Sequence, residues 1–224
     1  MKMRPMSNTR IENTLTSMMP FSFADRPRIR EWMDLFILAH QAAPKGLTIE
    51  IGTWRGGTTF AFLEMLEDLY HAQDRPMVFS IDPYGDKPYD GGDYDEKVAL
   101  FGASDYVAMR SLLAQYPNHA HWNIASEEFI CTLMGKRYWW QGEHKTVGRL
   151  AFVLIDGQHD AASIMLEVKG VVPHMAGGGK LVIDNTNNDP EPSPKSSGTS
   201  PVSAGPSGSS HTKASLWRDN DGSK

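Results

Sequence analysis

Apolar and polar positions follow one another along the chain in blocks that predict strands and helices in turn. Short apolar runs have the length and composition of buried strands, and the segments between them carry apolar residues at three- and four-residue spacing, as amphipathic helices do. The predicted strands are LTIEI (47–51), PMVFSID (76–82), HWNIA (121–125), RLAFVLID (149–156) and KLVIDN (180–185). Strands that alternate with helices predict an α/β domain whose parallel sheet is covered on both faces.

The predicted helices begin or end at recognisable residues. Asp25 can cap the first helix, whose apolar positions run from Ile29 to Ala39 before Pro44 and Gly46 end it. The others are a helix after Gly57, one from Ser104 to roughly Gln115, one over SEEFICTLM (126–134) and one over AASIMLEVKGVV (161–172), which Pro173 closes.

Two terminal segments differ from this pattern. Residues 1–24 are rich in Met and show no clear period, so we interpret them as an arm or lid. Residues 190–224 are dominated by Pro, Ser and Gly, and such a composition cannot bury a core. The sequence therefore predicts one folded domain over residues 25–189, followed by a disordered tail.

Composition and charge narrow the class of protein. The 224 residues are 40% hydrophobic and 22% charged, which is typical of a soluble globular protein, and a net charge of −5 gives no reason to expect nucleic acid or an anionic membrane as a partner. No apolar run is long enough to span a bilayer. The single cysteine, Cys131, excludes an internal disulfide and fits a reducing compartment, so we expect a cytoplasmic protein with Cys131 as a small buried residue.

Carboxylates stand at the ends of the predicted strands. Glu50, Asp82 and Asp156 end three of them, and Asp184 with Asn185 ends the last. In an open parallel sheet, ligands bind beyond the carboxyl ends of the strands. Because acidic residues in apolar strands are costly unless they are solvated or functional, this edge is the predicted ligand site.

A glycine-rich loop after the first strand indicates the kind of ligand. Its pattern is E-x-G-x-x-x-G-x-T, formed by Glu50, Gly52, Gly56 and Thr58. A dinucleotide site would instead show G-x-G-x-x-G, and a carboxylate beside the loop would repel a pyrophosphate. The pattern favours a cationic ligand that carries an amino group or a sulfonium.

The segment EIGTWRGGTT resembles motif I of the class I S-adenosylmethionine-dependent methyltransferases. The resemblance continues through FSIDPYG, NIASEEFI, VLIDGQHD and GGGKLVIDN, covers about residues 25–189, and is strongest to the metal-dependent O-methyltransferase branch that includes catechol-type, macrolide-sugar and cephalosporin-hydroxylase-like proteins. It implies a Rossmann-like, doubly wound parallel sheet of strand order 3-2-1-4-5. Family members continue with a helix and an antiparallel strand pair, for which this chain has no counterpart after the fifth strand.

Three explanations for that difference stay open. The sheet is trimmed, or a partner copy in a homo-oligomer supplies the missing edge, or the C-terminus is truncated or divergent. Each of them bears on stability and activity more than on cofactor binding, because the cofactor residues lie upstream.

The resemblance also assigns roles to residues. S-adenosylmethionine would be held by Glu50, Gly52, Thr53, Gly56, Thr58, Asp82, Ser126 and Asp156. Among these, Asp82 would bind the ribose hydroxyls and Ser126 would lie beside the adenine. Asp156, Asp184 and Asn185 offer hard oxygen ligands that suit Mg²⁺ or another divalent cation. His159 would take the proton of the acceptor hydroxyl.

The sequence thus predicts methyl transfer from S-adenosylmethionine to a hydroxyl of a small molecule, assisted by a divalent metal. Two alternatives remain: a module that binds S-adenosylmethionine without transferase activity, and a nicotinamide-dependent oxidoreductase, which the glycine spacing disfavours.

Overall fold

A parallel sheet lies at the centre of the protein, whose computed structural model describes residues 7–22, 24–84, 102–140, 143–157, 160–184 and 215–216. Its parallel strands are β1 (Leu47–Ile51), β2 (Val78–Ile81), β3 (His119–Trp122), β6 (Leu150–Ile155) and β7 (Met175–Ile183). They lie in the order β3-β2-β1-β6-β7, which is the predicted order 3-2-1-4-5. The predicted Rossmann-like α/β fold is therefore confirmed.

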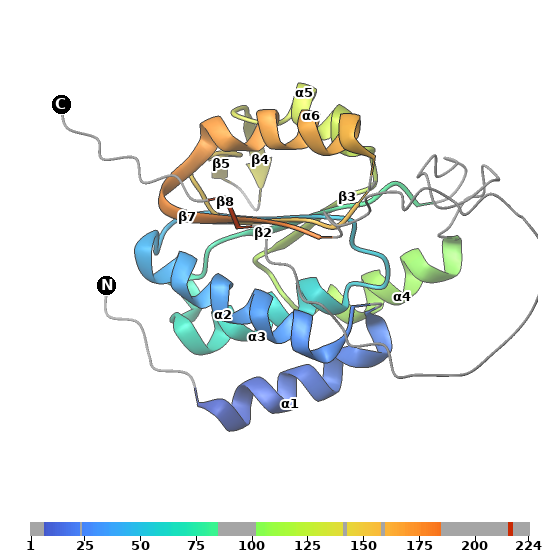
Figure 1. Cartoon of the computed structure of the whole chain (residues 1–224), viewed down its shortest axis with the longest axis vertical. Helices are drawn as coiled ribbons and strands as arrows, with labels where there is room; N and C mark the ends of the chain where they lie inside the picture. The colour runs from blue at the N-terminus through green and yellow to red at the C-terminus, as the bar shows by residue number, and fades with distance from the viewer. Residues whose placement is uncertain are drawn as a thin grey trace, which may run out of the picture.

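Helices cover both faces of this sheet (Figure 1). One face carries α1 (Asn8–Met18), α2 (Arg26–Ala42), α3 (Gly57–Leu69) and α4 (Ala103–Leu113), and the other carries α5 (Ser126–Thr132) and α6 (Ala161–Val171). Short 3-10 turns follow α1, α3 and α6, namely η1 (Met19–Phe21), η2 (Ala72–Asp74) and η3 (Val172–His174). No helix among the described residues is long and apolar enough to cross a membrane.

Each face of the sheet has an apolar core of its own. On the α1–α4 side, Phe36 stacks on Phe62 at a ring-centroid distance of 4.7 Å, and Phe152 packs edge-on against both rings. Because successive residues of a strand point to opposite faces, Ile49 and Ile51 of β1 enter the core on the α5–α6 side.

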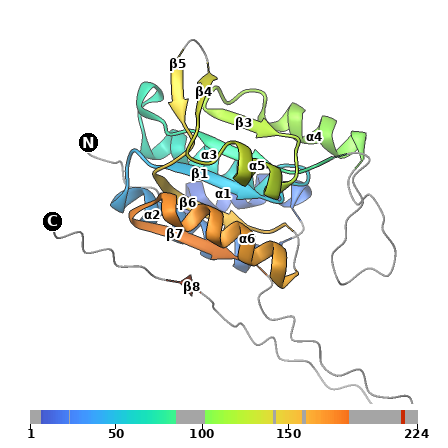
Figure 2. The same ribbon diagram turned by 90° about the horizontal axis from the view of Figure 1, so that it is seen from above.

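Antiparallel strands are present where the sequence predicts none. Ser215 and Leu216, within the predicted tail, form β8 (Ser215–Leu216), which pairs with Val182 and Leu181 of β7. Residues 190–214 and 217–224 of that tail lie outside the described residues. A separate hairpin joins β4 (Arg137–Trp140) to β5 (Glu143–Thr146), and Figure 2 shows it beside the end of the sheet that carries β3.

The N-terminal segment contains a packed helix. Ser7 caps α1, and Ile11, Leu15 and Met18 are buried with the core of the α1–α4 side. Arg10 adds ion pairs from α1 to two carboxylates of α3, at 2.7 Å from Glu64 and 2.9 Å from Asp68. The sequence prediction missed this helix, whereas the division of the chain into three domains stays a prediction.

Three local predictions differ from the structure. β3 begins at His119 because that residue pairs with Val78 of β2, so the strand lies earlier than residues 121–125. Helix α4 has Gly102 as its N-cap instead of Ser104, and the Gly102 amide donates to the Asp105 carboxylate at 3.2 Å. The prediction that Cys131 is buried is wrong: it is exposed near the end of α5.

Candidate active site

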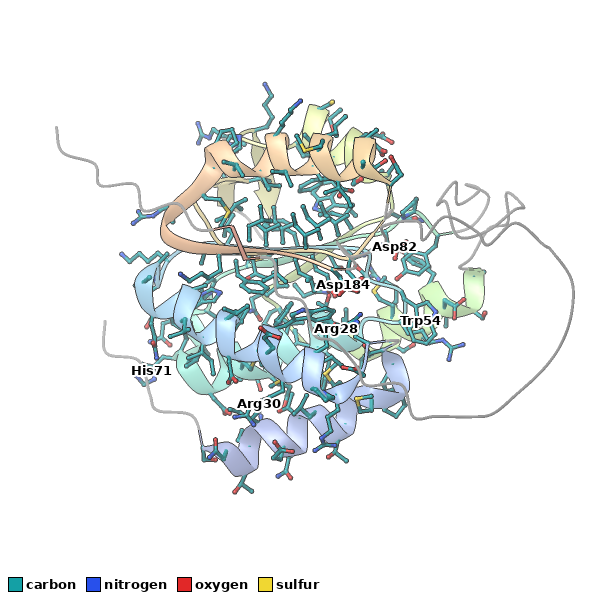
Figure 3. All side chains as sticks on the ribbon, viewed as in Figure 1. Arg28, Arg30, Trp54, His71, Asp82 and Asp184 are labelled. Atoms are coloured by element: carbon teal, nitrogen blue, oxygen red, sulfur yellow. The ribbon has the colours of Figure 1, made fainter. Side chains whose placement is uncertain are left out.

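Three carboxylates lie together at the carboxyl ends of the parallel strands. Asp82, Asp156 and Asp184 directly follow β2, β6 and β7. The amide of Asp156 donates to the Ile51 carbonyl and that of Asp184 to the Ile155 carbonyl, each at 2.8 Å, so neighbouring strands end in step. Figure 3 shows Asp82 and Asp184 at this edge. The sequence predicted polar side chains at this edge, with Glu50 and Asn185 in addition to these three.

Asp82 holds the loop that follows β1. Its Oδ2 accepts hydrogen bonds from the backbone amides of Thr53 and Trp54, both at 2.8 Å. Within the described part of the chain, its Oδ1 accepts none, which leaves that oxygen for the hydroxyl of a ligand. Burial raises the pKa of Asp82 to about 6, although the two amide bonds act in the opposite direction. The carboxylate therefore anchors the glycine loop.

The glycines of this loop accommodate the chain itself. Gly52 has a φ of 87°, and a Cβ there would lie 2.0 Å from the Asp156 carbonyl oxygen. Gly57 meets the N-terminal segment in the same way, because its Cβ would lie 2.5 Å from the Phe21 carbonyl oxygen. The sequence favours the approach of a cofactor at these positions. The structure gives a further reason for glycine, which is that β1, β6 and η1 meet here.

Gly56 and the two threonines complete the turn into α3. Gly56 has a φ of 84° and caps the helix, while Thr58 lies buried in the first helical turn. Thr53 is buried, and its Oγ1 has no hydrogen-bond partner among the described residues. A buried hydroxyl without a partner is uncommon and marks a position where a ligand or water completes the bonding. These residues fit the binding of a polar cofactor at the loop.

Glu50 lies beneath the loop instead of at the edge. It is the penultimate residue of β1, is only 1% exposed and accepts a hydrogen bond from Thr59 Oγ1. Burial raises the pKa of Glu50 well above its ordinary value, and the nearby charges of Asp156 and Asp82 raise it further. Glu50 thus carries a proton more readily than an exposed glutamate does.

This burial predicts a pH-dependent difference between the wild type and Glu50→Gln. A folded-state pKa above the unfolded value means that the stabilising contribution is complete below the unfolded pKa and is lost as the pH rises through the folded pKa. The glutamine of the variant does not titrate. We expect the wild type to lose stability relative to Glu50→Gln from pH 5 to pH 8, by at most about 1.4 kcal/mol per pH unit. Thermal melting of both proteins across this range measures the difference, and parallel pH profiles would contradict it.

Of the four remaining predicted site residues, two are within the described part of the chain. Ser126 begins α5, which follows β3, and Asp156 is partly exposed. His159 and Asn185, the predicted base and the third metal ligand, lie outside the described residues.

The predicted metal site includes Asn185, which lies outside the described residues, so this site stays a prediction. Among the described residues, no group of three His, Cys, Asp or Glu side chains is arranged to hold a metal ion. Asp184 instead forms an ion pair with Arg28, in which Nη1 lies 3.0 Å from Oδ2.

Two residues that the sequence did not single out support the site. Tyr84 donates from its amide to Asn123 Oδ1 at 2.8 Å and from its hydroxyl to the Trp54 carbonyl, so it connects the ends of β2 and β3 to the loop. Burial raises the pKa of Tyr84, which keeps its hydroxyl a donor. Arg28 is the other; Tyr84 lies within the FSIDPYG segment that carries the resemblance, whereas Arg28 belongs to no such motif.

A search of protein families identifies the class. The family described as "Methyltransferase domain" matches residues 49–186, from the middle of β1 to just past β7. The chain belongs to this methyltransferase family. The resemblance to class I S-adenosylmethionine-dependent methyltransferases is thereby confirmed. No match was found among curated proteins.

Several solved structures are similar to this protein, and the first of the three named here supports the fold. The O-methyltransferase NovP is 16% identical with a TM-score of 0.51, and the match covers 73% of this chain and 66% of NovP. An O-methyltransferase from Bacillus cereus, solved in complex with SAH, is 14% identical with a TM-score of 0.47 over 83% of this chain and 74% of its own. The SAH-bound methyltransferase PaMTH1 from Podospora anserina is 13% identical with a TM-score of 0.47, and the match covers 81% of this chain and 64% of PaMTH1. The chain thus spans slightly less than two thirds of NovP and of PaMTH1.

Proposed function

We propose that this protein transfers a methyl group from S-adenosylmethionine to a hydroxyl of a small molecule. The observation that carries the proposal is the loop after β1, where Asp82 holds the amides of Thr53 and Trp54 and the buried Thr53 hydroxyl has no partner in the described chain. Family membership supports the same reading. The names of the O-methyltransferases of similar fold suggest oxygen as the accepting atom.

The residues of the loop account for binding and orientation. Asp82 Oδ1 would accept a ribose hydroxyl, and Thr53 Oγ1 would bind a polar group of the cofactor. When bound, S-adenosylmethionine supplies a methyl group that its sulfonium activates for transfer to oxygen. The chain contributes by fixing the acceptor in line with that group and by taking up the hydroxyl proton, the role that the sequence predicts for His159.

Metal assistance, which the sequence predicts at Asp156, Asp184 and Asn185, is left out of this proposal. Its described ligands fit a divalent ion poorly, because the Asp184 carboxylate is already paired with a guanidinium. A location in the cytoplasm is part of the proposal, and the single cysteine and the lack of an apolar run that could span a bilayer support it.

Titration calorimetry tests the proposal. We expect S-adenosylmethionine and S-adenosylhomocysteine to bind and NAD not to bind. Release of S-adenosylhomocysteine in the presence of phenolic and sugar-hydroxyl acceptors would then demonstrate transfer. Binding without release from any acceptor would favour a cofactor-binding module, and binding of NAD alone would contradict the proposal.

A further inference from the structure

The first turn of α2 reaches the end of β7 through one ion pair. Arg28 Nη1 lies 3.0 Å from Asp184 Oδ2, although the two residues are 156 positions apart in the sequence. The Asp184 side chain is 10% exposed and that of Arg28 is 42% exposed. Figure 3 shows the two residues close together, at the edge where Asp82 also lies.

The geometry of α2 determines which arginine arrives there. Asp25 caps the helix by accepting from the Arg28 amide at 2.9 Å, which fixes the first turn, and α2 packs across β6 and β7. Arg30 is two residues further on and therefore points roughly 200° away around the helix. It pairs with Glu12 at 3.0 Å and Asp34 at 3.3 Å, far from Asp184 (Figure 3).

An ion pair at this position competes directly with a metal ion. Asp184 Oδ2 accepts from a guanidinium, so a divalent cation at Asp184 would have to share the carboxylate with the positive charge of Arg28. A second cation beside Asp184 would be repelled by Arg28, and because the Arg28 side chain is 42% exposed, water screens part of this repulsion. Moving Arg28 away to admit a metal would break its ion pair with Asp184.

We propose that Arg28 is the built-in cation of this site: its guanidinium takes the place beside Asp184 that a divalent metal would otherwise occupy. Asp184 is then an anchor for α2 and not a metal ligand. Arg28 acts as a positioning residue that ties the first turn of α2 to the end of β7. What this means for catalysis rests on the proposed function: if the protein is a methyltransferase, the Arg28–Asp184 pair implies that methyl transfer proceeds without a divalent metal.

The test measures Mn²⁺ binding by electron paramagnetic resonance on the full chain, without S-adenosylmethionine or an acceptor. We expect no saturable binding to the wild type at millimolar Mn²⁺, and at least a tenfold gain in affinity for Arg28→Gln. Arg30→Gln is the matched control, because it removes an arginine from the same helix but leaves Asp184 paired. It should bind Mn²⁺ no better than the wild type.

Thermal melting of the same variants tests the ion pair itself. Arg28→Gln should lower the melting temperature by about 2–5 °C, and adding Asp184→Asn should recover most of that loss, because the unpaired carboxylate is then removed.

Three results would overturn the proposal: tight Mn²⁺ binding by the wild type that Asp184→Asn abolishes, no gain of Mn²⁺ affinity in Arg28→Gln, or additive effects of the two substitutions on melting. Because none of these measurements uses the cofactor, a failure of S-adenosylmethionine to bind would count against the proposed function and leave this result standing.

Discussion

Replacing Gly52 with alanine should destabilise the protein by about 3 kcal/mol or more and abolish cofactor binding. Two costs combine, because a φ of 87° is unfavourable for alanine and the new Cβ would lie 2.0 Å from the Asp156 carbonyl oxygen. The opposing atoms belong to the backbone, so no side chain can rotate away. The turn must open, which would pull the amides of Thr53 and Trp54 from Asp82.

Differential scanning calorimetry should record this as a fall in melting temperature of about 6–12 °C. Gly177→Ala is the control, since a Cβ at that position in β7 meets nothing within 4 Å. It should change stability by less than about 0.5 kcal/mol. A Gly52→Ala protein as stable as the control would mean that the ends of β1 and β6 are not in the contact described.

Asp82 should show two separable functions. Asp82→Ala removes the acceptor of two backbone amides, one of them buried, and should lower the free energy of unfolding by about 2–5 kcal/mol. It should also weaken cofactor binding. Asp82→Asn keeps a carbonyl oxygen for those amides, so it should melt close to the wild type. It should still bind S-adenosylmethionine about tenfold more weakly, because charge-assisted bonds to the ribose are lost.

The pH dependence gives an independent reading of the same residue. Since burial raises the pKa of Asp82 to about 6, the carboxylate becomes protonated as the pH falls from 7 to 5. The affinity of the wild type for S-adenosylmethionine should decrease over this range, while that of Asp82→Asn should change less. Equal affinity of the two proteins at pH 7 would show that Asp82 only anchors the loop.

The sheet and the position of the site could be read from the sequence because both depend on local signals. Apolar runs gave the strands, and polar residues at their ends gave the edge at which Asp82, Asp156 and Asp184 lie. The signal for α1 was also local: Ser7 caps the helix, and Ile11, Leu15 and Met18 follow at the three- and four-residue spacing of a helix. The sequence interpretation missed it because the surrounding methionines and prolines obscured the spacing.

Contacts between distant segments could not be predicted in this way. Nothing near Arg28 in the sequence indicates Asp184, because their meeting depends on how α2 lies across β7. The burial of Glu50 could not be predicted either. The sequence predicts it at the tip of a strand, whereas the structure buries it beneath the glycine loop. Side-chain pairing of this kind follows from the assembled fold.

The placement of α2 over β6 and β7 has a consequence for synthesis on the ribosome. The helix is translated near the start of the chain, and its partner strands follow much later, with Arg28 and Asp184 156 positions apart. At about 5–20 residues per second, translation of that interval takes roughly 8–30 s. During this time, the face of α2 that carries Ile29, Trp32 and Phe36 has no sheet to cover it. We therefore expect this face of α2 to be more open to other chains during synthesis than in the folded protein.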